Sequence, residues 1–307
     1  MYEESQLLTK QYGTSYYYAA LLLTKVERNH IFALYSLCRY ADDLVDVDDG
    51  KPGTSLNAKK SLAKFEEKVN EAIDNNYKGE DLFGSIAKTW NELDLNRILL
   101  DKFFLSMRMD LTVSSYETLE DLQRYTDGSA AVIGEMVIPV IAPNINHDDI
   151  RETARNLGDA FQLTNFIRDI SEDLARGRTY LPLKDFANFG VDPKNIENNN
   201  DFKEFIKYEI ETTLKFYISA YEGVIKLKGR RGACVRTAYR LYGAILEEIC
   251  RADYEILNFR VRVPKSRKIF VMARELLRIR PKTLPNNYFI YKKYKFTSIL
   301  NAKRIST

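Results

Sequence analysis

Two clusters of oxygen-bearing side chains stand out in this 307-residue sequence. The first lies in LYSLCRYADDLVDVDDG, where one helix face would carry four residues spaced three or four apart: Tyr35, Arg39, Asp42 and Asp46. Asp43 stands beside them. Carboxylates one turn apart repel mildly when exposed, and cost far more when they are buried without partners. A bound cation would remove that cost.

The second cluster has the same helical spacing. In FQLTNFIRDISEDLARGRTYLP it comprises Gln162, Asn165, Asp169 and Asp173, flanked by Arg168 and Glu172. Carboxylate and amide oxygens are the ligands that Mg²⁺ prefers, and Mg²⁺ often binds substrate phosphates as well. Opposed across a helical core, the two faces would hold Mg²⁺, or Mn²⁺ in its place, together with diphosphates. The metal and the two arginines, Arg39 and Arg168, would neutralise charge on a departing diphosphate.

Other uses of these residues fit less well. Both faces could be solvated and carry incidental acids, but two matched faces argue against that. A calcium site is disfavoured because no EF-hand loop is present. A di-iron bundle needs two Glu-x-x-His motifs, and the two histidines give at most one, Glu27 to His30, because Asn144 stands three residues before His147. The three cysteines lack C-x-x-C spacing, so we expect no zinc site or disulfide framework and a reducing, cytoplasmic environment.

Helical periodicity dominates the chain, and Pro and Gly are scarce. We predict helices at residues 24–46, 56–73, 82–91, 95–111, 117–141, 148–174, 201–227, 232–258 and 265–279, with RTYLPLKDFANFG as a loop or short irregular segment. Short connections between long helices predict an all-α bundle, a single domain over residues 1–307 with a basic tail at about 282–307.

Charge is distributed unevenly between the two ends of the chain. Residues 260–307 contain 14 Lys or Arg and one acid, and the rest of the chain carries a net charge of −10. This basic, aromatic-rich segment suits anionic lipid or phosphate groups, although a solvated tail is also consistent. The acidic remainder disfavours nucleic-acid binding. The N-terminus lacks signal-peptide features, and no apolar run is long enough to span a bilayer.

From about Tyr12 to about Ile269 the sequence resembles the squalene/phytoene synthase family. YSLCRYADDLVD and FQLTNFIRDISEDLARGRTYLP are similar to its two aspartate-rich signatures. YGTSYYYAALLL, RYTDGSAAVIGEM and YRLYGAIL resemble further family segments. The resemblance implies an isoprenoid-synthase helical bundle with a central active-site cavity. It also implies Mg²⁺-dependent head-to-head condensation of two prenyl diphosphates through a cyclopropyl diphosphate intermediate.

The resemblance also assigns roles to residues. It implies the metal ligands Asp42, Asp46, Asn165, Asp169 and Asp173. It implies catalytic roles for Asp42, Asp43, Asp46, Tyr35, Arg39, Asp169, Asp173 and Tyr242. It implies substrate contacts from Tyr12, Gly13, Thr14, Ser15, Ala20, Tyr35, Arg39, Gln162, Arg168, Tyr242 and Arg260. Asp110 matches a family position without an evident role, and Asp127 stands where some relatives carry an aromatic residue.

The choice of substrate stays open between two lengths. The G-S-A-A motif and Gly13 look more like the phytoene-forming branch, which joins two geranylgeranyl diphosphates and needs no NADPH. Ala20 would leave room for that longer chain. The alternative is a squalene, dehydrosqualene or hydroxysqualene synthase that uses farnesyl diphosphate. A non-catalytic relative is less consistent, because every matched ligand is retained. A hydrocarbon product predicts peripheral membrane association; the oligomeric state is not indicated.

Overall fold

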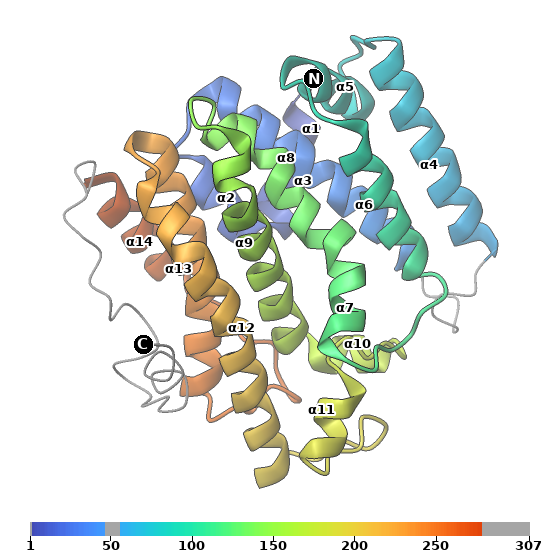
Figure 1. The fold of residues 1–307 in the computed structure, drawn as a ribbon, viewed down its shortest axis with the longest axis vertical. Helices are drawn as coiled ribbons and strands as arrows, with labels where there is room; N and C mark the ends of the chain where they lie inside the picture. The colour runs from blue at the N-terminus through green and yellow to red at the C-terminus, as the bar shows by residue number, and fades with distance from the viewer. Residues whose placement is uncertain (1, 47–55, 278–307) are drawn as a thin grey trace.

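The computed structural model describes residues 2–46 and 56–277, and within these residues the regular elements are helices, with no strand (Figure 1). The first half comprises α1 (Glu3–Tyr12), α2 (Thr14–Ala20), α3 (Lys25–Val45), α4 (Leu56–Asp74), α5 (Leu82–Glu92), α6 (Arg97–Met109) and α7 (Leu119–Thr126). The second comprises a π-helical turn η1 (Asp127–Ala131), α8 (Val132–Ile141), α9 (His147–Arg168), α10 (Ile170–Ala175), α11 (Leu183–Asn188), α12 (Asn200–Lys226), α13 (Gly229–Arg251) and α14 (Lys265–Leu277). The predicted all-α class is confirmed.

Side-chain caps fix where several helices begin. Thr24 and Glu27 form a reciprocal capping box at the start of α3, and Thr118 and Asp121 form another at α7. Asn199 caps α12 by accepting a hydrogen bond from the Phe202 backbone. These local signals explain why the predicted starts of the long helices agree with the structure to within a few residues.

Helix α9 runs through the centre of the bundle and packs against α8, α12 and α13 (Figure 1). Its apolar face joins the larger hydrophobic core, to which α12 and α13 also contribute. A second core lies among α3, α4, α5 and α6. Helices α3 and α8 contact each other, and so connect the two cores. The acidic segments of α3 and α9 are thereby held on rigid helices within the bundle.

The structure differs from the predicted elements at four places. The predicted helix 148–174 breaks at Asp169, whose φ and ψ are −100° and 8°. The predicted helix 117–141 contains η1, where a Cβ on Gly128 would lie 2.1 Å from the Lys102 carbonyl oxygen. The predicted helix 232–258 ends at Arg251, because Asp253 and Tyr254 adopt positive φ. The predicted loop RTYLPLKDFANFG contains α11.

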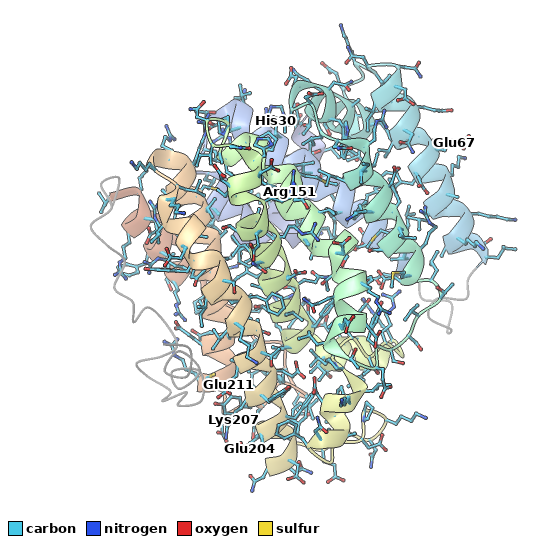
Figure 2. The ribbon with its side chains drawn as sticks, in the orientation of Figure 1. His30, Glu67, Arg151, Glu204, Lys207 and Glu211 are labelled. Atoms are coloured by element: carbon cyan, nitrogen blue, oxygen red, sulfur yellow. The ribbon has the colours of Figure 1, made fainter. Side chains whose placement is uncertain are left out.

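Charged side chains cover the outside of the bundle, as the labelled Glu67, Arg151 and Glu204 illustrate (Figure 2). None of the described helices is long and apolar enough to cross a membrane. Within the described ranges the three cysteines are free thiols. The single domain stays a prediction, and the tail at 282–307 lies outside the described residues.

Candidate active site

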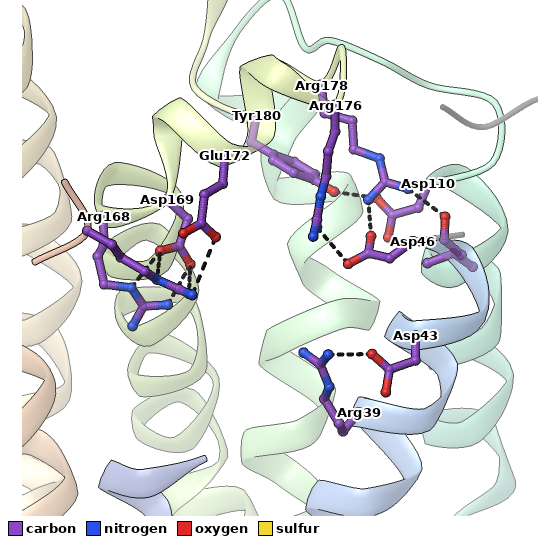
Figure 3. A network of polar contacts seen from close by, with 12 residues as sticks. Arg39, Asp43, Asp46, Asp110, Arg168, Asp169, Glu172, Arg176, Arg178 and Tyr180 are labelled. Atoms are coloured by element: carbon purple, nitrogen blue, oxygen red, sulfur yellow. Dashed lines mark hydrogen bonds and ion pairs between the residues drawn. The ribbon is translucent and has the colours of Figure 1, made fainter. Parts of the chain in front are cut away.

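The first acidic face lies at the C-terminal end of α3. Tyr35, Arg39 and Asp42 follow one another along the helix, and Asp46 caps its end. Arg39 forms an ion pair with Asp43, which is half exposed (Figure 3). The Nε of Arg39 is buried without a hydrogen-bond partner in the described structure. The face therefore has both a cation and carboxylates directed at the same region.

Two arginines that follow α10 hold Asp46. Arg176 donates to one carboxylate oxygen at 2.8 Å, and Arg178 binds the other (Figure 3). Arg178 also donates to the carbonyl of Val45 at 2.8 Å and is buried. Because Arg176 and Arg178 belong to the second aspartate-rich segment, these contacts join the two acidic segments directly.

The second acidic face lies at the junction of α9 and α10. Arg168 donates two hydrogen bonds to the neighbouring Asp169 carboxylate, and the one from its Nε is 2.7 Å long. Arg260 contacts both oxygens of Asp169 at 2.8 Å and reaches Glu172 at 3.3 Å. The predicted candidate Arg260 therefore lies at this face. In Figure 3 the Asp169 group lies at the left of the view and the Asp46 group at the right.

The carboxylates of the two faces influence one another. The pKa of Asp42 is raised to about 8, mainly by burial and secondly by the negative charges of Asp46 and Asp110. The pKa of Asp173 is likewise raised to about 8, mainly by burial and secondly by the negative charges of Asp169 and Asp46. Asp46 thus acts on a carboxyl of each segment, which places both faces in one electrostatic environment. Even with the arginines present, this environment favours additional positive charge.

Aromatic rings pack together beside the polar groups. The rings of Tyr242 and Phe161 stack with centroids 4.2 Å apart. Tyr16 lies 5.0 Å from Tyr242 and 5.9 Å from Tyr35. Burial raises the pKa of Tyr16, Tyr35 and Tyr242, so these phenols stay neutral at physiological pH. Residues from α2, α3, α9 and α13 therefore form one electron-rich cluster.

The N-terminal segment is fitted closely against this cluster. The Arg39 guanidinium lies 4.3 Å from the centroid of the Tyr12 ring. A Cβ on Gly13 would lie 2.6 Å from the Tyr35 ring, so a larger residue here would have to displace that ring. Lys268 of α14 donates to the Thr14 hydroxyl. Ser15 is half-buried on α2 and Ala20 is fully buried at its end.

Asp110 organises two further tyrosines. Its carboxylate oxygens accept hydrogen bonds from Tyr125 and Tyr180, each 2.8 Å long. Burial raises the pKa of Asp110 to about 6, although Arg178 and the two phenols oppose the shift. Tyr180 belongs to the second aspartate-rich segment, so Asp110 binds that segment directly. Arg178, whose charge acts on Asp110, binds Asp46 of the first segment.

Asp127 has a structural explanation that the sequence did not reveal. It forms ion pairs with Arg155 of α9 and with Lys102 of α6, the latter at 3.0 Å. Burial alone would raise its pKa, but the hydrogen bonds from Arg155 and Lys102 outweigh burial and lower it. This carboxylate therefore ties η1 to its neighbouring helices.

The donor set fits a hard divalent cation. It offers carboxylate oxygens from both faces and the Oδ1 of Asn165, which is buried without a hydrogen-bond partner in the described structure. Within residues 2–46 and 56–277, no three His, Cys, Asp or Glu side chains converge to hold a metal ion as they stand. Arginines already hold Asp46 and Asp169. Metal binding would accordingly require some of these ion pairs to open.

Comparison with known proteins identifies the family. The model of the squalene/phytoene synthase family matches residues 9–267. The chain belongs to the squalene/phytoene synthase family. It is therefore a prenyltransferase, of a family whose enzymes use prenyl diphosphates.

Similar curated proteins include phytoene synthases. The chain is 32% identical to the phytoene synthase of Arthrospira platensis over 91% of this chain and 93% of that protein. It is 30% identical to the 15-cis-phytoene synthase of Synechocystis sp. over 90% of this chain and 85% of that protein.

Solved structures support the same fold. A dehydrosqualene synthase structure has a TM-score of 0.79 at 22% identity, over 89% of this chain and 94% of that chain. A squalene synthase from Alicyclobacillus acidocaldarius has a TM-score of 0.71 at 23% identity, over 82% of this chain and 94% of that chain.

Sequence reasoning found most of the residues that gather here and missed three basic ones. Arg176 and Arg178 were visible as the RGR that follows the second acidic motif. Lys268 had no comparable signal, because it reaches Thr14 from 254 residues away in the chain. Gln162 is half-buried on α9. The roles of all the site residues stay predictions.

Proposed function

We propose that the protein is a 15-cis-phytoene synthase, which condenses two geranylgeranyl diphosphates head to head and releases two diphosphates. The observation that carries the proposal is the direct contact of the two acidic segments through Arg176 and Asp46. It gives one site with carboxylates, arginines and buried aromatic rings. The similarity to phytoene synthases over about nine-tenths of the chain supports the choice of product.

Basic residues bind the diphosphates directly, and acidic residues bind them through the metal. Arg39, Arg168 and Arg260 exchange their carboxylate partners for phosphate oxygens when substrate enters. Lys268, which is buried and has Arg168 and Arg262 nearby, offers further positive charge beside Thr14. These cations stabilise charge that develops as each diphosphate leaves.

Release of Asp169 by Arg168 and Arg260, together with release of Asp46 by Arg176, would leave these two carboxylates free to hold a metal. Asp42 and Asp46 serve from α3, and Asn165, Asp169 and Asp173 from α9 and α10. Asp43, which pairs with Arg39 before the diphosphate enters, completes the first acidic set. Bound Mg²⁺, or Mn²⁺, supplies Lewis-acid neutralisation of the diphosphate oxygens.

The aromatic cluster protects the carbocations. Ionisation of one substrate gives an allylic cation, which the double bond of the other attacks, and proton loss gives a cyclopropyl diphosphate. Departure of the second diphosphate gives a cation that rearranges and loses a proton, so no NADPH is consumed. The faces of Tyr16, Tyr35 and Tyr242 stabilise positive charge by about 0.5–2 kcal/mol each. Their packing excludes water, which would quench the cation.

The product is a hydrocarbon and must leave into lipid. We therefore assign the protein to the cytoplasmic side of a membrane as a peripheral protein. The basic, aromatic composition of residues 260–307 is consistent with that assignment.

The second candidate within the family uses farnesyl diphosphate. The similarity of the fold to a dehydrosqualene synthase structure keeps this candidate open, although at 22% identity it indicates the fold alone. The two candidates differ in product mass. They also differ in need for a reductant if squalene is the product.

Incubation of purified protein with Mg²⁺ and either prenyl diphosphate, without NADPH, tests the proposal. We expect a C40 hydrocarbon with the mass of phytoene from geranylgeranyl diphosphate, and little product from farnesyl diphosphate. A dehydrosqualene-type product from farnesyl diphosphate alone would select the second candidate. No product from either substrate, with farnesyl diphosphate tested also in the presence of NADPH, would contradict both.

A further inference from the structure

Helix α14 has an apolar face that none of the described residues covers. Ile269, Phe270, Ala273, Leu276 and Leu277 are all exposed and recur at helical spacing along α14. Phe270 is 65% exposed and Leu277 is 87% exposed. Figure 1 shows α14 at the edge of the bundle, beside α13. A contiguous exposed apolar face of this kind marks an interaction surface.

The opposite face of α14 is fixed firmly to the protein. Glu275 is completely buried and forms ion pairs with Arg236 at 2.9 Å and Arg240 at 2.7 Å. Val271 is buried in the larger core, and Arg267 pairs with Glu247 and Glu248 of α13. The helix is thus held rigidly with its apolar side outward, and the exposure is not explained by loose packing.

The charges around this face select its partner. The sole acid between residues 259 and 277 is Glu275, whose carboxylate is buried. Arg262 and Lys265 are exposed just before the apolar stripe. The sequence that follows α14, residues 278–307, contains eight Lys or Arg and no acid. An apolar helical face on a segment whose exposed charges are all cationic matches an anionic lipid surface, in which such helices lie parallel to the membrane.

We propose that α14 is the membrane-contact element of this protein, with Ile269, Phe270, Leu276 and Leu277 inserted among the acyl chains of an anionic bilayer. Arg262 and Lys265 contact the lipid headgroups. The same helix contacts α2 through Lys268 and Thr14, so it separates the substrate-binding segment from the bilayer by about one helix diameter, roughly 10 Å. Only the purpose of this membrane contact, the release of a hydrocarbon product, rests on the proposed function.

A tryptophan placed on the face reports directly on contact with lipid. In the full-length Phe270→Trp variant, the introduced indole should emit at shorter wavelength with vesicles of phosphatidylcholine and phosphatidylglycerol, and brominated acyl chains should quench it. Native Trp90 is buried, and its signal is subtracted using the wild-type protein. The matched control is Leu105→Trp, since Leu105 is 56% exposed on α6, away from α14 (Figure 1).

A second pair of variants tests the contribution to binding. We expect Ile269→Ser with Phe270→Ser to weaken partitioning onto these vesicles at least about tenfold, because inserted apolar area is lost. The control pair Ile98→Ser with Leu105→Ser, equally exposed on α6, should change it less than about twofold. Circular dichroism confirms that each variant is folded. Vesicles of phosphatidylcholine alone, or added salt, should weaken binding of the wild type.

Three outcomes would overturn the proposal. Binding of the Phe270→Trp variant to vesicles without quenching of its introduced indole would place the contact on another part of the chain, such as residues 278–307. Short-wavelength emission from that indole that vesicles do not change would show that a second copy or another segment covers the face. No binding to anionic vesicles would exclude the surface altogether. All these vesicle measurements omit substrate, so a negative result leaves the proposed condensation reaction unaffected. If the condensation assay gives no product, the vesicle measurements can still be interpreted.

Discussion

The guanidinium of Arg176 lies 2.8 Å from the carboxylate of Asp46, which stands 130 residues earlier in the chain. This contact, with that of Arg178 on the same carboxylate, brings the two aspartate-rich segments together. In this structure these arginines supply positive charge beside the Asp46 carboxylate. Substrate and metal would take over that role, which makes each ion pair a point where binding and structure are coupled.

Removing one acid should abolish activity while sparing the fold. We expect Asp42→Asn to lower turnover at saturating Mg²⁺ at least about 100-fold, measured as product formed. Without metal, the variant should be as stable as the wild type or more stable, because burial and neighbouring acids disfavour the Asp42 charge. Asp148→Asn, an exposed acid elsewhere, is the control. Full activity of Asp42→Asn in EDTA would refute the metal assignment.

The two arginines on Asp46 should differ in their effect on stability. Arg178 is buried and also binds the Val45 carbonyl, so we expect Arg178→Gln to lower the free energy of unfolding by about 3 kcal/mol. The Arg176 side chain is half exposed, and Arg176→Gln should cost less than about 1 kcal/mol. Urea unfolding measures both. Equal losses would show that burial does not separate their roles.

Asp110 should make stability depend on pH. Its pKa is raised to about 6 in the folded protein, against about 4 when unfolded. The folded state therefore binds the proton more tightly, and this group's contribution to stability falls as pH rises from about 4 to about 6. Asp110→Asn should remove about 2–3 kcal/mol of that fall. Urea unfolding across this range tests it, with Asp148→Asn as control; parallel profiles for wild type and Asp110→Asn would contradict it.

Gly13 should be required for the position of Tyr35. A Cβ at Gly13 would lie 2.6 Å from the Tyr35 ring, whereas one at Gly243 meets nothing within 4 Å. We expect Gly13→Ala to reduce kcat/KM about tenfold or more by displacing the ring, and Gly243→Ala to be tolerated or to stabilise α13 by up to about 1 kcal/mol. Steady-state kinetics of the pair decides. Wild-type kinetics for Gly13→Ala would mean that the ring position is unimportant.

Ala20 should influence substrate length. It is buried at the end of α2, and each extra CH₂ of substrate buried beside it would contribute about 0.8 kcal/mol. In competition assays we expect Ala20→Phe to shift the product ratio from the product of geranylgeranyl diphosphate towards the product of farnesyl diphosphate. If Ala20 serves only helix packing, stability and both activities will fall together and the ratio will not change.

Local physics made much of this arrangement predictable from the sequence. Apolar spacing predicted the starts of α3, α9 and α12 to within one residue, and four-residue spacing put Asp42 and Asp46 on one face. The π-helical turn at Asp127 places Gly128 against the Lys102 carbonyl, and the carboxylate at the Asp169 break pairs with the distant Arg260; periodicity encodes neither contact. The Arg176–Asp46 and Lys268–Thr14 contacts likewise join distant segments, so they required the fold.

The central claim is that α3 and the α9–α10 junction form a single metal and diphosphate site. Anomalous diffraction from crystals containing Mn²⁺ and an unreactive geranylgeranyl thiodiphosphate tests it most directly. The account predicts Mn²⁺ peaks about 2.0–2.2 Å from oxygens of Asp42 or Asp46 and of Asn165 or Asp169, joined by one or more diphosphates, with Arg176 moved away from Asp46. Diphosphate bound with no Mn²⁺ at either face, and with the Arg176–Asp46 pair intact, would contradict it.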